Sequence, residues 1–168
     1  LDLLINLSAS PFTTSKKEER GNVFAKISEK LNIPLIYVNQ TGGQDELVFD
    51  GTSSVINKQG DVTIELKSFA TDSIQFNHED LNNSSIKEKT SNRLKDLYDS
   101  LVLATKDYVE KNNFKGVLIG SSGGIDSALT ATIATDALGS EKVRTIMMPF
   151  KYTADISIID AALLAKNL

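Results

Sequence analysis

The stretch that decides the fold runs from Val117 to Ser127 and reads VLIGSSGGIDS. Its opening apolar residues, 117–119, predict a short buried strand, and the apolar spacing over 125–138 predicts a helix. The glycine- and serine-rich segment between them predicts a tight turn. Because ligands bind at the carboxyl ends of the strands in an open α/β sheet, we expect the functional site at this turn.

The turn has the composition of a phosphate-binding loop. Gly123 and Gly124 have no side chain to block a close backbone approach and they permit positive φ, so consecutive N–H groups can point at one anion. The helix that follows adds its positive N-terminal end, and the hydroxyls of Ser122 and Ser127 can donate to phosphate oxygens. The alternative is that the glycine pair only makes a tight turn and that Asp126 and Ser127 complement the first helical turn.

The acidic residue distinguishes this loop from the common nucleotide-binding motifs. A Walker A loop needs a lysine where this chain has Asp126, and the G-x-G-x-x-G pattern of a Rossmann dinucleotide loop cannot be placed here. A carboxylate beside a bound phosphate is repulsive unless a cation lies between them. Asp126 therefore predicts a Mg²⁺ ion that bridges the acid and the phosphate.

The sequence around the loop alternates between helices and strands. A helix is expected at 93–112, ahead of the loop, and a second strand at 143–148 and a helix from Asp155 follow it. Short connections between such elements predict a parallel sheet with right-handed crossovers.

Residues 1–66 contain a second set of elements. A strand at 1–9, a helix at 15–31 and a strand at 35–38 are followed by short strands and tight turns, which we interpret as a β-hairpin. The first half is therefore also an α/β structure.

The chain thus divides into two α/β domains. We place the first at 1–76 and the second at 93–168, joined by a linker at 77–92 that contains only two aliphatic residues. The chain begins on a strand pattern and stops at Leu168 within a helical pattern, so we expect a fragment of a longer chain.

Composition excludes several classes of protein. The chain has 168 residues, 40% hydrophobic and 24% charged, which excludes disorder as a whole, and a net charge of −4 provides no general attraction to nucleic acid. No apolar run approaches the roughly 18 residues of a membrane span, so we expect a cytoplasmic protein without membrane or nucleic-acid partners. The absence of cysteine excludes disulfides and thiolate metal sites, and the single His78 excludes a multi-histidine site.

The loop also resembles a known motif. Residues Ser122 to Ser127 resemble the PP-loop of the ATP pyrophosphatase superfamily, whose members form adenylates and release pyrophosphate. The sequence around it is similar to the synthetase domain of the glutamine-dependent NAD synthetase family. That similarity is carried by 103–109, 127–131, 137–139, 147–152 and 160–161.

The first half is similar to another part of the same family. Residues 6–12, 37–40 and 42–53 resemble the C-terminal part of its nitrilase-type glutaminase domain. The two resemblances together imply the end of a nitrilase-like α/β sandwich, followed by a Rossmann-like parallel sheet of the PP-loop type.

The resemblance implies a C–N bond-forming ligase. It implies that ATP and Mg²⁺ adenylate the carboxylate of deamido-NAD (nicotinic acid adenine dinucleotide), and that ammonia from glutamine displaces AMP to give NAD, with pyrophosphate released. The implied partners are deamido-NAD, ATP and glutamine or ammonia, and the implied assembly is a homo-oligomer. Two alternatives remain: another PP-loop enzyme, GMP-synthetase-like or tRNA-modifying, or a non-catalytic remnant that only binds nucleotide or forms an oligomer.

The resemblance also implies which residues form the site. The expected ATP-binding residues are Gly120, Ser121, Ser122, Gly123, Gly124, Ile125, Asp126, Ser127 and Met148. Asp126 is the expected Mg²⁺ ligand, and Met148 is expected beside the adenine or ribose, with ordinary core packing as its alternative. Ser8 and Ser10 are candidates to border the glutamine pocket. The alternative for these two serines is that they only form the turn before Pro11.

No catalytic residue is expected within this chain. The glutaminase of this family uses a cysteine nucleophile, and the chain contains no cysteine, so we expect these 168 residues alone neither to hydrolyse glutamine nor to make NAD. We interpret Asp45, Glu46 and Asp50 as structural, because no lysine or cysteine lies near them to complete an acid/base site.

Overall fold

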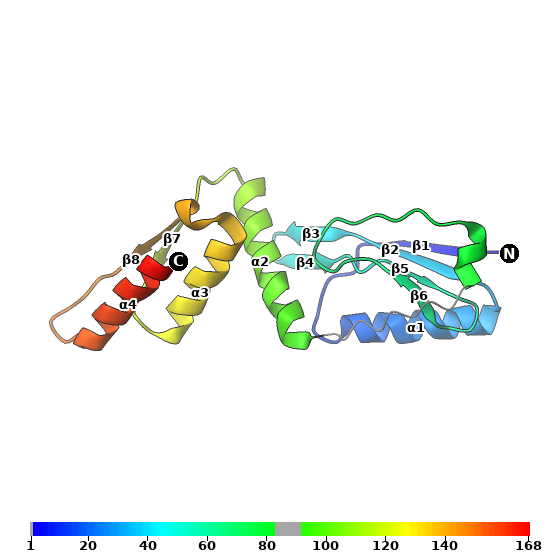
Figure 1. Ribbon diagram of the computed structural model, residues 1–168, viewed down its shortest axis with the longest axis horizontal. Coiled ribbons are helices and arrows are strands. Elements are labelled where there is room, and N and C mark those ends of the chain that lie inside the picture. The colour runs from blue at the N-terminus through cyan, green and yellow to red at the C-terminus, as the bar shows by residue number, and fades with distance from the viewer. Residues whose placement is uncertain (1, 83–91) are drawn as a thin grey trace. The chain divides into compact units, whose positions relative to one another are not determined.

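The computed structural model describes residues 2–82 and 92–168. The chain forms two compact units, Leu1–Ser100 and Leu101–Leu168 (Figure 1). The predicted domain boundaries at 76 and 93 remain a prediction, and 83–91 of the expected linker lie outside the described residues.

The first unit contains a four-stranded sheet in the order β1-β2-β5-β6. Its strands are β1 (Leu4–Ser8), β2 (Leu35–Asn39), β5 (Ser54–Ile56) and β6 (Val62–Glu65). β1 and β2 are parallel, with Leu4 opposite Leu35, whereas β2 pairs with β5 and β5 with β6 in antiparallel fashion. The helix α1 (Lys16–Leu31) connects the parallel pair and runs along the sheet (Figure 1).

Helix α1 forms where the sequence predicts it and covers the core of the first unit. Leu35, Tyr37 and Ile56 are almost completely buried, and Phe24 and Ile27 of α1 pack against them. Burying a large apolar side chain of this kind stabilises the fold by about 1.5–3 kcal/mol.

The expected single hairpin in the first unit is instead two separate ribbons. β3 (Thr41–Gln44) pairs with β4 (Leu47–Asp50), and β5 pairs with β6. Gly51 separates them: its φ is +65°, and a side chain there would collide with the Thr41 hydroxyl. The chain turns at this glycine, which interrupts the run of strands.

Part of the range predicted to be a linker forms structure. Residues His78–Asn82 make a short 3₁₀ helix, η1, in which Leu81 is only 2% exposed. One aliphatic side chain is thus enough to pack this turn.

The second unit contains the predicted parallel pair. β7 (Val117–Gly120) runs parallel to β8 (Val143–Ile146), with Val117 opposite Val143. Helix α3 (Ile125–Leu138) and the 3₁₀ turn η2 (Ser140–Lys142) connect the two strands, and α4 (Asp155–Asn167) follows.

The core of the second unit also uses the end of α2 (Arg93–Lys111). Val109 of this helix packs with Ala137 and Leu138 of α3, and the valines at 102, 117 and 143 lie against them. The sequence predicts a buried strand at 117–119, but Leu118 is 64% exposed, because α3 and α2 cover one face of the strand only.

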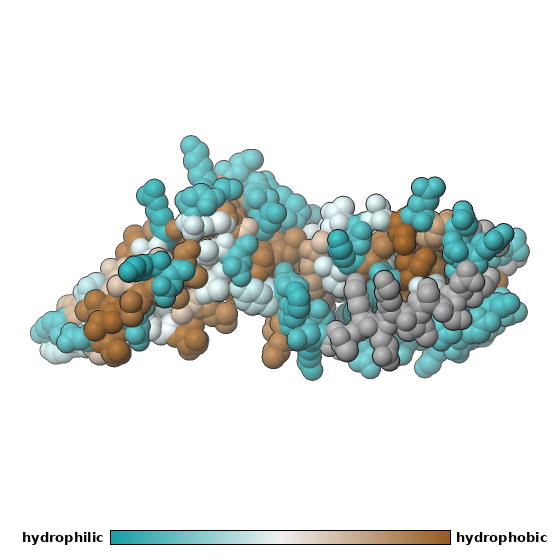
Figure 2. Space-filling view, viewed as in Figure 1, coloured by the Kyte–Doolittle hydropathy of each residue, from teal (hydrophilic) through white to brown (hydrophobic). Residues whose placement is uncertain are grey.

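Large apolar side chains lie at the surface of the second unit. They are Ile125, Leu129, Ile156, Ile159 and Leu163 of α3 and α4. Figure 2 shows hydrophobic residues gathered around α4. None of the described helices combines the length and the apolar character needed to cross a membrane.

Candidate functional site

The predicted phosphate-binding loop lies at the carboxyl end of the parallel strands. β7 ends at Gly120 and α3 begins at Ile125, so four residues make the turn. The N–H of Ser121 donates to the carbonyl of Ile146 at 2.8 Å, which extends the pairing of β7 with β8 by one residue. The loop therefore starts from a fixed backbone position.

Gly123 is required by the geometry of this loop. Its φ is +80°, and a Cβ there would collide with the backbone carbonyl of Ser157 in α4. A side chain would thus be both strained and obstructed. Gly124 caps α3 with an extended backbone that any residue can adopt, so its benefit is only the absence of a side chain at the exposed loop.

The loop is closed by its own hydroxyls. The Oγ atoms of Ser122 and Ser127 lie 3.2 Å apart, and the N–H groups of Gly124 and Ser122 donate to the hydroxyls of Ser122 and Ser127, each at 3.3 Å. These bonds are long and exposed, and a phosphate oxygen is a stronger acceptor than a hydroxyl. An anion can therefore replace the hydroxyls as the partner of both N–H groups.

Ser121 differs from the other serines of the loop. Its side chain is only 6% exposed, and its Oγ has no hydrogen-bond partner in the structure. Ser121 follows Val117 and Ile119 on the inward face of β7, whereas Ser122 is exposed. The hydroxyl of Ser121 thus lies beneath the loop, away from the exposed groups.

Ile125 and Asp126 lie on the first turn of α3, and both are exposed. Among the residues that the structure describes, no three acidic or histidine side chains converge on one point. A single carboxylate nevertheless fits Mg²⁺, which usually keeps several waters and binds one or two carboxylates together with substrate phosphates. The assignment of Mg²⁺ to Asp126 stays a prediction.

Met148 lies close to the loop and outside the core. It is 79% exposed, and its Cε lies 3.9 Å from the point where a Cβ of Gly120 would be. Among the described residues, Met148 therefore does not pack into a core. Two exposed aromatic rings follow, Phe150 and Tyr152, with centroids 5.8 Å apart.

Residues 8–12 form another loop, at the end of β1, in the parallel pair of the first unit. Ser8 donates from its hydroxyl to Asn6 Oδ1 at 2.5 Å. The backbone of Ser10 is bound on both sides by the side chain of Asn39: its N–H donates to Oδ1 at 2.8 Å, and its carbonyl accepts from Nδ2 at 3.2 Å. The predicted Ser8 and Ser10 are thus close neighbours in one well-held loop.

Buried charges that the sequence analysis did not include in a site lie next to this loop. The guanidinium of Arg20 forms an ion pair with Asp50, and both side chains are more than nine-tenths buried. The loop's Ser10 carbonyl also accepts from Arg20 at 3.4 Å. Arg20 lies four residues before Phe24, on the packed face of α1. This spacing in the sequence indicates that the charge of Arg20 faces inward.

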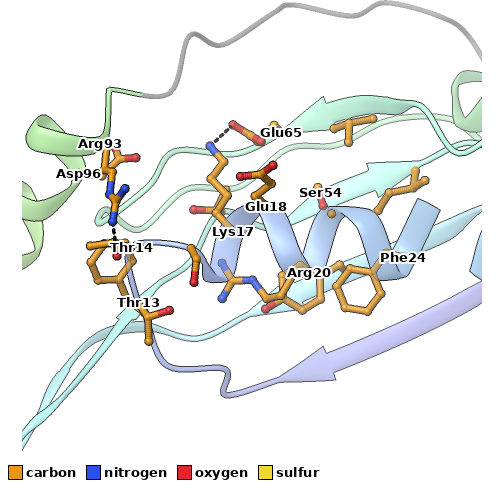
Figure 3. Close-up of a pocket in the computed structure, with 17 residues that line it drawn as sticks. Thr13, Thr14, Lys17, Glu18, Arg20, Phe24, Ser54, Glu65, Arg93 and Asp96 are labelled. Atoms are coloured by element: carbon orange, nitrogen blue, oxygen red, sulfur yellow. Dashed lines mark hydrogen bonds and ion pairs between the residues drawn. The ribbon is translucent and has the colours of Figure 1, made fainter. Parts of the chain in front are cut away.

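A cavity in the first unit borders the end of this loop. It has a volume of about 460 Å³, and Phe12, Arg20 and Thr52 are among the residues that line it, whereas Ser8 and Ser10 are not. Lys17 and Glu65 point toward one another at 2.9 Å, and Arg93 donates to Thr14 at 3.1 Å (Figure 3). Tyr37 also lines the cavity, and burial raises the pKa of its phenol.

The family model described as NAD synthase matches residues 97–168. The glutamine-dependent NAD(+) synthetase of Acinetobacter baylyi is 40% identical to this chain and aligns with 100% of it and 32% of its own length. The enzyme of the same name from Synechocystis is 41% identical, with 100% and 31% covered. The chain belongs to the glutamine-dependent NAD synthetase family. It spans about a third of the length of the curated relatives it matches.

Solved structures of the family have the same fold. The glutamine-dependent NAD+ synthetase of Acinetobacter baumannii, determined in complex with ADP, is 40% identical and matches with a TM-score of 0.92 over 99% of this chain and 32% of that one. The enzyme from Cytophaga hutchinsonii, at 18% identity, matches with a TM-score of 0.84 over 98% of this chain and 34% of that one. The predicted α/β fold class is confirmed.

Proposed function

We propose that this chain takes part in the ATP-dependent amidation of deamido-NAD to NAD, with ammonia supplied by glutamine hydrolysis. The reaction would proceed through an acyl-adenylate and release AMP and pyrophosphate. The observation that supports this most is the alignment of the entire chain with glutamine-dependent NAD synthetases at 40% identity. The geometry of the Ser121–Gly124 turn, at the carboxyl end of a parallel strand pair, supports it independently.

The second unit would bind ATP. The N–H groups of Ser122 and Gly124 would bind the phosphates, since their present hydroxyl partners are exposed and 3.3 Å away. The hydroxyl of Ser127, which now donates to the Gly124 carbonyl at 3.0 Å, would turn to the same phosphates. Gly123 gives the loop the left-handed turn that this arrangement requires. Met148 would contact the adenine or ribose from its exposed position beside Gly120.

Asp126 would hold Mg²⁺ together with the phosphates. When bound, the ion neutralises the negative charge of the phosphates and so supports adenylation. The protein's own part is to hold the phosphates and the carboxylate of deamido-NAD in line. Such positioning is effective because a carboxylate is a poor electrophile, whereas its adenylate is a good one.

The first unit would contribute to the glutamine site through the loop at 8–12. Ser8 and Ser10 stand at the carboxyl end of β1, which is a common location for ligand-binding groups. These 168 residues contain no cysteine, so we propose that they do not hydrolyse glutamine by themselves. We further propose that the protein is a homo-oligomer and acts in the cytoplasm.

The test is an assay of the protein that carries this chain. Purified protein would be incubated with deamido-NAD, ATP, Mg²⁺ and either glutamine or ammonium chloride, and NAD and AMP would be measured. We expect both products in equal amounts with either nitrogen source. Synthesis from xanthosine monophosphate, modification of tRNA, or no ATP-dependent reaction at all would contradict the proposal and favour another PP-loop function.

A further inference from the structure

A buried polar cluster lies at the carboxyl ends of β1, β2 and β4. It consists of the Ser10 backbone and the side chains of Arg20, Asn39, Asp50 and Thr52. These four side chains are all less than a tenth exposed. Its central contact is the pair of hydrogen bonds, described above, between the Asn39 amide and the two backbone groups of Ser10. The amide thus takes the place of a neighbouring strand for this residue.

The orientation of the Asn39 amide is set by Asp50. Nδ2 of Asn39 donates to Oδ1 of Asp50 at 3.1 Å, and a carboxylate can only accept, so the amide must turn its nitrogen toward Asp50. Its oxygen then faces the N–H of Ser10. The second carboxylate oxygen of Asp50 accepts from Arg20 and, at 3.2 Å, from Thr52.

The loop has few other attachments. The N–H of Phe12 donates to the carbonyl of Val48 at 2.7 Å, and the carbonyl of Ser8 accepts from Gln40 at 3.0 Å. Pro11 has no N–H and restricts Ser10 to an extended backbone, but it does not fix the position of the loop. Between Ser8 and Phe12, the side chains of Asn39 and Arg20 bind the backbone of Ser10.

We propose that Asn39, oriented by Asp50 and Arg20, is a positioning residue for the glutamine-binding loop at 8–12. This role rests on the proposed function, because it assumes that the loop borders the glutamine pocket. A buried ion pair adds little net stability, but it fixes one arrangement of its neighbours. Loss of the amide would let the loop move without removing any group that touches substrate.

The structure provides a matched control at Asn57. That side chain is also buried; its Oδ1 accepts from the N–H groups of Gln59 and Asp61, and its Nδ2 donates to the Asp61 carboxylate at 3.3 Å. Asn57 lies in the turn between β5 and β6, away from the loop at 8–12. Changing either asparagine to aspartate places a new carboxylate beside an existing one.

The experiment compares Asn39→Asp with Asn57→Asp in the protein that carries this chain. We expect Asn39→Asp to lower kcat/KM for glutamine by about tenfold or more, since a small displacement of a positioned group has effects of this size. Its rate with ammonia should stay within about twofold of wild type, because the second unit is unchanged. Asn57→Asp should keep the wild-type rates with both glutamine and ammonia, even if its Tm falls by as much as that of Asn39→Asp.

The positioning role would be overturned if both variants lost kcat/KM for glutamine to the same extent. It would also be overturned if Asn39→Asp left the glutamine rate unchanged. If Asn39→Asp does not fold, Asn39→Ser and Asn57→Ser decide the question by the same comparison, since serine removes the amide without adding charge. A wild-type protein that makes NAD from ammonia but never from glutamine would instead overturn the glutamine part of the proposed function, and this role with it.

Discussion

Two loops in this chain occupy equivalent places and are held in opposite ways. Residues 8–12 follow β1 and residues 121–124 follow β7, and each of these strands is half of a parallel pair. The first loop is held by buried side chains from β2 and α1, including an ion pair. The second is fixed at its start by the bond from the Ser121 N–H to the Ile146 carbonyl, and beyond Ser121 it is held by exposed hydroxyls and by the close approach of Gly123 to Ser157 of α4.

The difference indicates what each loop is built to do. A loop whose polar groups are already bound by buried partners is fixed before any ligand arrives. In the second loop, the N–H groups of Ser122 and Gly124 donate to exposed hydroxyls at 3.3 Å, and they can exchange these partners for an anion. We infer that the first loop supports a site and that the second is itself a binding surface.

The largest effect should come from removing the charge that supports the first loop. Arg20→Met leaves the Asp50 carboxylate buried and unpaired, so we expect it to lower the free energy of unfolding by about 3–5 kcal/mol. The control is Lys16→Met, which breaks the exposed pair with Glu19 and should cost about 0–1 kcal/mol. Urea unfolding of the two variants measures both values. Similar losses would mean that the buried pair does not hold the first loop.

The next effect concerns the backbone of the second loop. Gly123→Ala places a Cβ at a φ of +80° and against the carbonyl of Ser157. We expect destabilisation of about 2 kcal/mol and weaker ATP binding, measured by thermal unfolding and calorimetry. Gly124→Ala is the control, since the backbone of Gly124 is extended. A Cβ added there would lie 3.4 Å from its nearest neighbour, Ser122 Oγ. A full effect of Gly124→Ala with none of Gly123→Ala would contradict the geometry.

A smaller effect, of opposite sign, is expected at Ser121. Its hydroxyl is buried without a partner, so Ser121→Ala should raise the free energy of unfolding by about 0.5–1 kcal/mol and leave ATP binding nearly unchanged. Ser28→Ala in α1 removes another buried, unpartnered hydroxyl and should also stabilise. Ser122→Ala should instead weaken ATP binding. Loss of ATP affinity in Ser121→Ala as large as in Ser122→Ala would show that Ser121 faces the nucleotide.

The smallest effect appears only in alkaline solution. Burial raises the pKa of Tyr37, so the folded state keeps the phenol proton to a higher pH than the unfolded state does. The protonated phenol therefore contributes to the free energy of unfolding. This contribution is complete below about pH 10 and is lost as the pH rises through the folded-state pKa. Stability measured by urea unfolding should therefore fall above pH 10, and Tyr37→Phe should flatten that slope. An equal slope in both proteins would assign it to other groups.

The sequence was informative wherever the signal was local. The parallel pair β7 and β8 follows from the apolar segments around Val117 and Val143, and the tight turn between β7 and α3 follows from the glycine pair. The inward direction of Ser121 could also have been predicted, because alternation along a strand places it on the same face as Val117 and Ile119.

The first loop's supporting cluster could not be predicted in the same way. It joins Ser10, Arg20, Asn39 and Asp50, which come together only after β1, α1, β2 and β4 have folded. The spacing of Arg20 and Phe24 indicates that Arg20 faces inward, but no periodicity connects Arg20 to Ser10, Asn39 or Asp50, so its partners cannot be read from the sequence. The interpretation of Asp50 as structural stays a prediction, and its partner Arg20 is shown only by the structure.

The most direct test of the account is the effect of Asp126→Asn on ATP-dependent NAD formation in the protein that carries this chain. The carboxylate is exposed, so the substitution should leave Tm unchanged. If Asp126 holds Mg²⁺ against the phosphates, the rate should fall by about 100-fold or more with either glutamine or ammonia. A variant that makes NAD at the wild-type rate and with the wild-type Mg²⁺ requirement would contradict the assignment of this loop as the ATP site.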